Sequence, residues 1–115
     1  MRRSPEPFDR LATLDKAVHE PARLAILTAL SACRSAEFRY LQALTGLTQG
    51  NLSMHLTKLS EKGFIAMAKR FEGRYPATSV SLTPAGRRAI GDHWEQLDAL
   101  RAAANALGDH PRRSE

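Results

Sequence analysis

The chain has 115 residues, which suits one domain, and it carries a formal net charge of +5 with a single cysteine. One cysteine excludes an internal disulfide and a thiolate-rich zinc site. No apolar run is long enough to span a membrane or to act as a signal peptide, so we expect a cytoplasmic protein.

The charge is distributed unevenly along the chain. Residues 1–83 hold 12 Lys and Arg against 7 Asp and Glu, whereas residues 84–115 hold 5 of each. A basic excess confined to one part of a domain is typical of proteins that bind polyanions.

The two ends of the chain, residues 1–7 and 108–115, are polar and lack apolar periodicity, so we expect both to be disordered. Apolar residues spaced three and four apart predict a short amphipathic helix over 8–19. Pro21 suits the first position of the next helix. That helix, over 21–32, is apolar around much of its circumference, which predicts a central core helix.

A short connection leads to the next helix. Phe38 in this connection belongs either to a brief strand or to a plug of the core. Residues 39–46 then form a short helix that ends at Gly46, a residue type favoured at helix C-termini.

The stretch LTQGNLSMHLTKLSEKGFI, residues 47–65, predicts a helix over 49–62 with marked ends. Thr48 is a good N-cap. Gly63 and Phe64 suit the left-handed turn and apolar contact of a Schellman motif. The helix is held down by one apolar face, made of Leu52, Leu56 and Leu59.

The opposite face of this helix carries small and polar residues instead of a spread of charges. At about 100° per residue, Gly50, Met54 and Thr57 point away from the leucines. Asn51 and Lys58 flank them on one side, and Ser53 lies on the other.

The next segment, FIAMAKRFEGRYPATSVSLT, alternates apolar and small residues around Gly73, which predicts a β-hairpin. Its loop is longer and more basic than a tight turn requires. Three cations surround the tip, Lys69, Arg70 and Arg74, against the single carboxylate of Glu72.

Thr83 and Pro84 are an N-cap followed by a proline at the first helical position, which predicts a helix over 84–107. At 1.5 Å per residue this helix is roughly 35 Å long, which is long for so small a domain. Its apolar stripe is therefore expected to overhang the core and form a dimer interface, made of Ile90, Trp94, Leu97, Leu100, Ala104 and Leu107. Packing of Trp94 inside its own chain is the open alternative.

Two motifs together carry a family resemblance. LQALTGLTQGNLSMHLTKLSEKGFI, followed at the right separation by LTPAGR, resembles the winged helix-turn-helix transcriptional regulators related to the MarR and ArsR families. The resemblance covers about residues 10–100. It implies a mainly α fold with a small β-hairpin wing, a DNA-binding domain over 8–83 and a C-terminal dimerisation helix over 84–107.

The resemblance also implies a function. We expect a sequence-specific DNA-binding transcriptional regulator, acting as a repressor, that binds a pseudo-palindromic operator of double-stranded DNA as a homodimer. Gln49 and Asn51 are the expected base readers, because amide side chains pair with adenine in the major groove. Thr48 and the first helical amides suit a phosphate. The other expected DNA contacts are Gly50, Ser53, Met54, His55, Thr57 and Lys58 on the helix, and Lys69, Arg70 and Arg74 on the wing.

Several alternatives stay open. The helix face and the basic tip are also compatible with a weakly charged surface helix and a solvated loop. Met54 is typical of adaptable protein contacts, so the hypothesis of a winged-helix protein–protein interaction module stands beside DNA binding. Cys33 is either a small buried hydrophobe or a redox-sensing thiol.

A sensor on the same scaffold is the last alternative, although the effector is unknown and no ligand site is evident. Asp92, His93 and Glu95 cluster, but we interpret them as a solvated face rather than as a metal site. The sequence predicts neither metal nor other cofactor. It shows no catalytic constellation, so we expect no enzyme.

Overall fold

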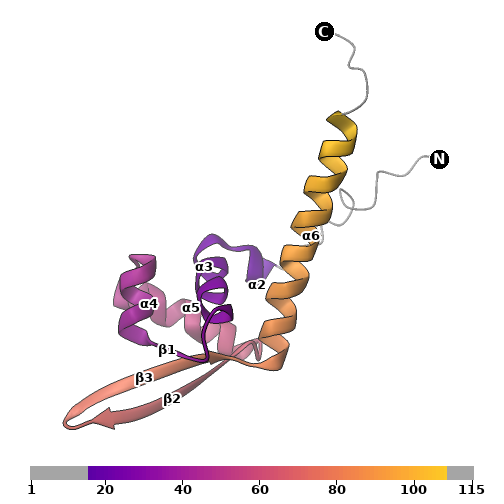
Figure 1. Ribbon diagram of the computed structural model, residues 1–115. Helices are drawn as coiled ribbons and strands as arrows, with labels where there is room; N and C mark the ends of the chain where they lie inside the picture. The colour runs from indigo at the N-terminus through magenta and orange to yellow at the C-terminus, as the bar shows by residue number, and fades with distance from the viewer. Residues whose placement is uncertain (1–15, 109–115) are drawn as a thin grey trace.

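The computed structural model describes residues 16–108 and confirms a mainly α fold with a small β-sheet (Figure 1). The predicted disorder of residues 1–7 lies outside the described residues, as does most of the predicted helix over 8–19. The tail predicted to be disordered over 108–115 also lies outside them, except for Gly108, which is the last residue of helix α6. The elements in chain order are α2 (Lys16–His19), α3 (Pro21–Ser31), β1 (Ala36–Glu37), α4 (Phe38–Thr45), α5 (Gln49–Glu61), β2 (Ile65–Glu72), β3 (Tyr75–Leu82) and α6 (Pro84–Gly108).

The sheet has three antiparallel strands in the order β1-β3-β2. β2 and β3 form the predicted hairpin, paired from Ile65 opposite Leu82 to Glu72 opposite Tyr75. Gly73 in the turn has a φ of 65°, a left-handed conformation that favours glycine. The alternative left open for Phe38 is now resolved, since the strand stops at Glu37 and Phe38 begins α4.

The core lies between α3, α5 and the base of the hairpin. Leucine and isoleucine side chains of α3 are fully buried, which confirms it as the central helix, and the leucines of α5 and α4 pack against them. The largest fully buried side chains are Ile26, Leu27, Leu30, Leu41, Leu52, Leu56, Leu59, Val18 and Val80.

A hydrogen-bonded junction joins the end of α5 to the start of α6. The Thr83 hydroxyl donates to the Gly63 carbonyl at 2.6 Å and accepts from the Gly86 amide at 3.0 Å, which is the predicted N-cap. The Thr83 amide donates to the Phe64 carbonyl at 3.0 Å. A Cβ on Gly86 would overlap that same carbonyl, so only glycine fits. This contact explains the LTPAGR motif.

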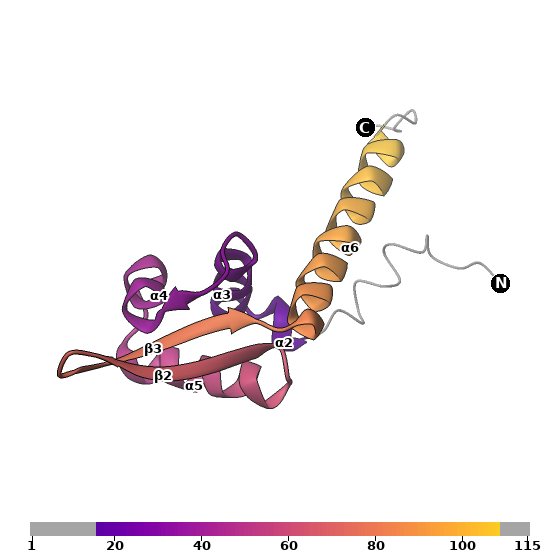
Figure 2. The same ribbon diagram turned by 60° about the horizontal axis from the view of Figure 1, so that its bottom comes forward.

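The long helix α6 packs on the domain only through its first turns. Gly86, Ile90 and His93 are buried, and the helix then leads away from the sheet (Figure 2). Ile90 was predicted in the dimer interface, but at 3% exposure it belongs to the core of its own chain, because it lies in the part of α6 that contacts α3 and β3. Trp94 and Leu107 are exposed at 40% and 52%.

Candidate nucleic-acid interface

Both ends of α5 are fixed by local hydrogen bonds. The Thr48 hydroxyl accepts from the Asn51 amide at 3.1 Å. At the other end, the Phe64 amide donates to the Leu59 carbonyl at 3.0 Å, and Gly63, with a φ of 79°, donates to Ser60 at 2.9 Å. These are the two bonds of a Schellman motif, so both predicted caps are confirmed.

The polar face of α5 points to solvent, as the helical periodicity predicts. The leucines on the opposite face are at most 1% exposed. Met54 is 44% exposed, which leaves it free for a partner. The exposed residues of α5 and its N-cap are Thr48, Gln49, Gly50, Asn51, Ser53, Met54, Thr57, Lys58, Ser60 and Glu61.

His55 is the exception among the predicted DNA contacts. It is only 7% exposed, because it lies beside the leucine stripe and faces α3. The Arg23 guanidinium, which can only donate, lies with Nη1 at 3.3 Å from His55 Nδ1, so Nδ1 is an acceptor. Glu20 Oε1 is farther from the same atom, at 3.9 Å. The prediction that His55 contacts DNA is therefore wrong, and its role is to hold α5 against α3.

The hairpin separates two of the three predicted wing cations. Lys69 pairs with Thr78 and Arg70 with Ala77, so the two side chains project from opposite faces of the sheet. Arg74 lies in the turn between Glu72 and Tyr75. All three cations are exposed.

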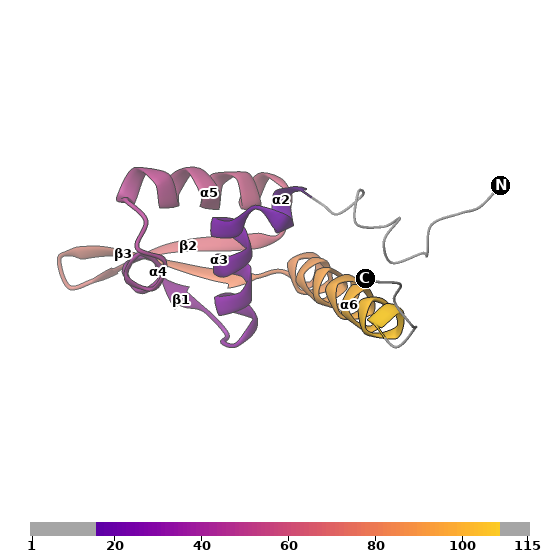
Figure 3. The same ribbon diagram turned by 90° about the horizontal axis from the view of Figure 1, so that it is seen from above.

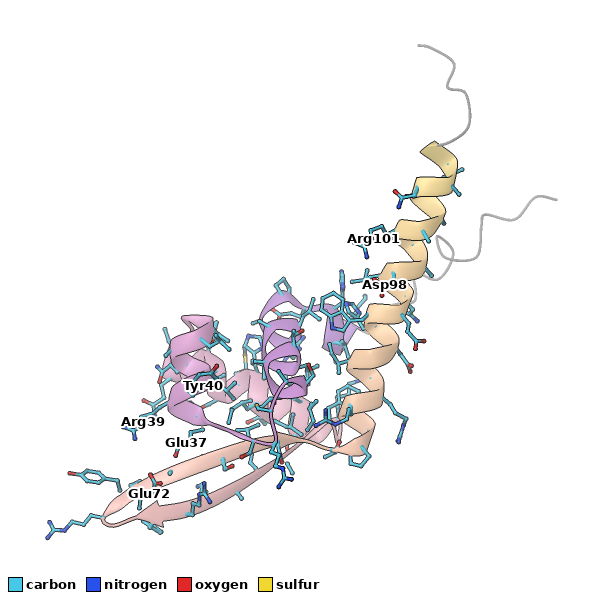
Figure 4. The ribbon with its side chains drawn as sticks, in the orientation of Figure 1. Glu37, Arg39, Tyr40, Glu72, Asp98 and Arg101 are labelled. Atoms are coloured by element: carbon cyan, nitrogen blue, oxygen red, sulfur yellow. The ribbon has the colours of Figure 1, made fainter. Side chains whose placement is uncertain are left out.

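A cleft of about 430 Å³ lies between the N-terminal half of α5, the hairpin and α4. We call it the wing-side cleft. Gln49 and Ser53 line it from α5 and Lys69 from the wing. Figure 4 shows Arg39, in the first turn of α4, and Glu37, at the end of β1, on the side that faces the hairpin, and both residues line this cleft.

Sequence reasoning missed Arg39 and Glu37, because no local signal shows that the start of α4 faces the wing. It also gave no weight to two aromatic residues that flank the hairpin turn. Phe71 and Tyr75 are 72% and 75% exposed, and their position around Gly73 in a basic hairpin was visible in the sequence.

Away from this interface, the side chain of His93 on α6 is buried next to His19 of α2. Its ring centroid lies 5.2 Å from that of His19 and 5.7 Å from that of Trp94. Burial lowers the pKa of His93, and the nearby His19 lowers it further. The Nε2 atom has no hydrogen-bond partner among the described residues. The prediction that His93 belongs to a solvated face is therefore wrong, whereas Asp92 and Glu95 are exposed, as predicted.

Within residues 16–108, no three His, Cys, Asp or Glu side chains gather closely enough to hold a metal ion. In the same part of the chain, no helix is both long and apolar enough to cross a membrane. Cys33 is half-buried rather than fully buried, and its thiol donates to the Ala29 carbonyl at 3.5 Å.

Known proteins share both sequence and fold with this chain. The profile of the family described as "Winged helix DNA-binding domain" matches residues 22–100. An uncharacterized protein of Methanocaldococcus jannaschii is 35% identical over 82 residues, which span 71% of this chain and 89% of that protein.

Solved structures agree with the family match. A transcriptional regulator homologue from Pyrococcus horikoshii has a TM-score of 0.74 and 28% identity, covering 90% of this chain and 98% of its own. The transcriptional regulator BldR from Sulfolobus solfataricus has a TM-score of 0.62 and 25% identity, with 94% and 73% covered. Both structures are thus of a transcriptional regulator or of a homologue of one. The resemblance to MarR-type regulators is thus confirmed, and the chain belongs to the winged helix DNA-binding domain family.

Proposed function

We propose that this protein is a sequence-specific transcriptional repressor that binds a pseudo-palindromic operator as a homodimer. One observation carries the proposal. The polar face of α5 is exposed along its whole length and adjoins a hairpin with basic residues at its outer half. A helix with such a face fits the major groove of B-DNA, and the hairpin then reaches the neighbouring backbone or minor groove.

Gln49 and Asn51 are the proposed base readers. Both are exposed in the first turn of α5, and Gly50 between them keeps the backbone close to the bases. The Thr48 hydroxyl accepts the Asn51 amide, so its own proton stays available for a phosphate oxygen.

The remaining exposed polar and basic side chains are proposed to position the protein on the backbone without reading sequence. Ser53, Thr57 and Lys58 supply such contacts from α5. Met54 is the exception, because its proposed contact is a thymine methyl, which belongs to a base. Lys69 and Arg39 reach a phosphate from the wing-side cleft, and Arg70 and Arg74 reach DNA from the outer face and the tip of the wing.

The proposed dimer uses the distal part of α6. Trp94 and Leu107 are exposed, and Leu97 and Leu100 are only half-buried by their own chain. Together with Ala104 they form the apolar stripe that a second copy would cover. A two-fold dimer presents two α5 helices to successive major grooves, about one helical turn apart. A protein that occupies such a site excludes other proteins from it, which supports repression.

The test is fluorescence anisotropy with mixed genomic DNA fragments over a series of salt concentrations. We expect the logarithm of the binding constant to fall linearly with the logarithm of the salt concentration, with a slope that reflects several phosphate contacts. An absence of binding at low salt contradicts the proposal.

A second candidate function is a protein-interaction module. The exposed Phe71 and Tyr75 at the wing tip favour it, because aromatic residues are enriched at protein interfaces. This candidate predicts no salt-dependent binding in the same titration.

A further inference from the structure

The outer half of the wing carries the two most exposed large apolar side chains among the described residues. Phe71 and Tyr75 are 72% and 75% exposed, on either side of the turn at Gly73. Figure 3 shows this turn extending past α4 and past the N-terminal end of α5, away from α6. The apolar surface that Phe71 leaves in water is therefore available to a partner.

The two aromatic side chains lie on opposite faces of the hairpin. Phe71 pairs with Pro76 on the other strand. Tyr75 pairs with Glu72, one position further out, and neighbouring positions of a strand point to opposite faces. Lys69 shares the face of Phe71, and both Lys69 and Pro76 line the wing-side cleft beside α5. Phe71 thus lies on the face that is turned towards the recognition helix, and Tyr75 lies on the outer face.

The wing is long enough to bring Phe71 to the groove next to the one that α5 occupies. The outermost hairpin pair with a fully buried member joins Met67 to Val80. Phe71 lies four residues beyond Met67, roughly 13 Å at about 3.3 Å per residue. This length exceeds half the width of a major groove, which is about 12 Å across. The tip therefore reaches past one phosphate backbone to the minor groove.

The charges around the tip favour nucleic acid over protein as the partner of Phe71. Lys69, Arg70 and Arg74 all lie within three residues of it, against the single carboxylate of Glu72. Lysine is depleted at protein–protein interfaces, so this setting does not suit an aromatic anchor for a protein. Proteins that bind the minor groove, by contrast, combine such cations with an apolar side chain that inserts between base pairs.

We propose that Phe71 is a wedge that inserts between two base pairs in the minor groove beside α5, partly unstacks them and kinks the operator. The proposal rests on the DNA-binding function proposed above. Pyrimidine–purine steps such as TA and CA are the easiest to unstack. Phe71 therefore makes the protein selective for such a step, at a position where no side chain reads a base by hydrogen bonds.

The first experiment measures the bend by the gel mobility of circularly permuted DNA. The probe is the genomic fragment that binds most tightly in the salt titration. We expect the complex to migrate most slowly when the site is central, as for a bend of at least about 20° at each wing. Phe71→Ala should lose at least about half of this bend and keep the salt slope, because no charge is removed.

Tyr75→Ala is the matched control for Phe71→Ala. It removes an aromatic side chain of nearly equal exposure from the outer face of the same tip, so it should bend DNA like the unaltered chain. Both variants should unfold at the temperature of the unaltered chain, because both side chains are exposed. An equal loss of the bend in the two variants overturns the proposal. So does a Phe71→Ala protein that bends DNA normally, which leaves the tip for a protein partner.

The second experiment tests the selectivity for a flexible step. Each pyrimidine–purine step beside the site is replaced in turn by the stiff step AA. At one position in each half-site, the change should weaken binding of the unaltered chain at least about fivefold, and of Phe71→Ala by less than about twofold. Equal weakening of both proteins at every position overturns the proposal. A complex that forms on straight DNA contradicts only the wedge, whereas a failure to bind any fragment contradicts the DNA-binding function itself.

Discussion

The helices α5 and α6 both follow a threonine N-cap and both carry an apolar stripe, yet they use that stripe differently. α5 buries Leu52, Leu56 and Leu59 in its own chain, each at most 1% exposed. α6 buries only its first turns and leaves Trp94 and Leu107 exposed at 40% and 52%. The periodicity of apolar residues on a helix indicates that this face packs against another element. Only the arrangement of the neighbouring elements shows whether that element belongs to the same chain or to a second copy.

The difference matters for function, because the two helices are joined. Thr83 ties the C-terminal turn of α5 to the first turn of α6 through bonds to Gly63, Phe64 and Gly86. A dimer formed through α6 would therefore set the position of α5, and with it the spacing of two recognition helices.

The largest expected effect tests the buried stripe of α5. Leu56→Ala should lower the free energy of unfolding by about 2–5 kcal/mol, because it leaves a cavity in a fully packed core. Leu107→Ala, measured in urea at dilutions where the chain is monomeric, should change it by less than about 0.5 kcal/mol. Equal effects would remove the distinction between the two stripes.

The junction between the helices is the next target. Gly86→Ala should destabilise the fold by about 1–3 kcal/mol, because the added methyl overlaps the Phe64 carbonyl. Gly91→Ala is the matched control, since a Cβ there meets no atom within 4 Å and alanine favours a helix. A stable Gly86→Ala protein in thermal unfolding would refute the close approach of α6.

Charged substitutions on the exposed apolar stripe of α6 test whether this stripe forms the dimer interface. Leu100→Glu combined with Leu107→Glu should weaken the dimer by at least tenfold, about 1.4 kcal/mol, because it places carboxylates in an apolar interface. Sedimentation over a range of protein concentrations measures the change. Unaltered sedimentation would contradict an interface on this stripe.

The smallest effect concerns pH and the buried part of α6. Because burial holds the pKa of His93 below its usual 6.5, the unfolded chain binds a proton more readily. Stability should thus be complete above about pH 6.5 and decline as the pH falls towards the lowered pKa. Urea unfolding of His93→Leu should show a weaker decline over this range than the unaltered chain. An identical decline in both would show that His93 does not contribute.

Local chemistry made much of this molecule predictable. Thr48, Gly63 and Thr83 mark helix ends through bonds to residues a few positions away, and the leucine spacing orients the polar face of α5. Alternation along β2 could also have separated Lys69 from Arg70, because neighbouring residues of a strand face opposite ways.

Residues whose role depends on distant elements were not predictable in the same way. His55 lies at the edge of a helical stripe, and only the position of Arg23 on α3 shows that it is buried and bonded. Ile90 and His93 belong to the core because the first turns of α6 pack on α2 and α3. Arg39 lines the wing-side cleft only because the fold brings the start of α4 close to the hairpin, and no local sequence pattern indicates this.

We propose that α5 reads DNA while the wing positions it. Selection of binding sites from random DNA, followed by affinity measurements over a salt series, separates these two roles. We expect a two-fold symmetric site, a loss of about 1–3 kcal/mol at particular base pairs for Gln49→Ala or Asn51→Ala, and uniformly weaker binding with a salt slope shallower by about 1 for Arg74→Ala. Identical behaviour of the three variants, or no enriched site, would contradict it.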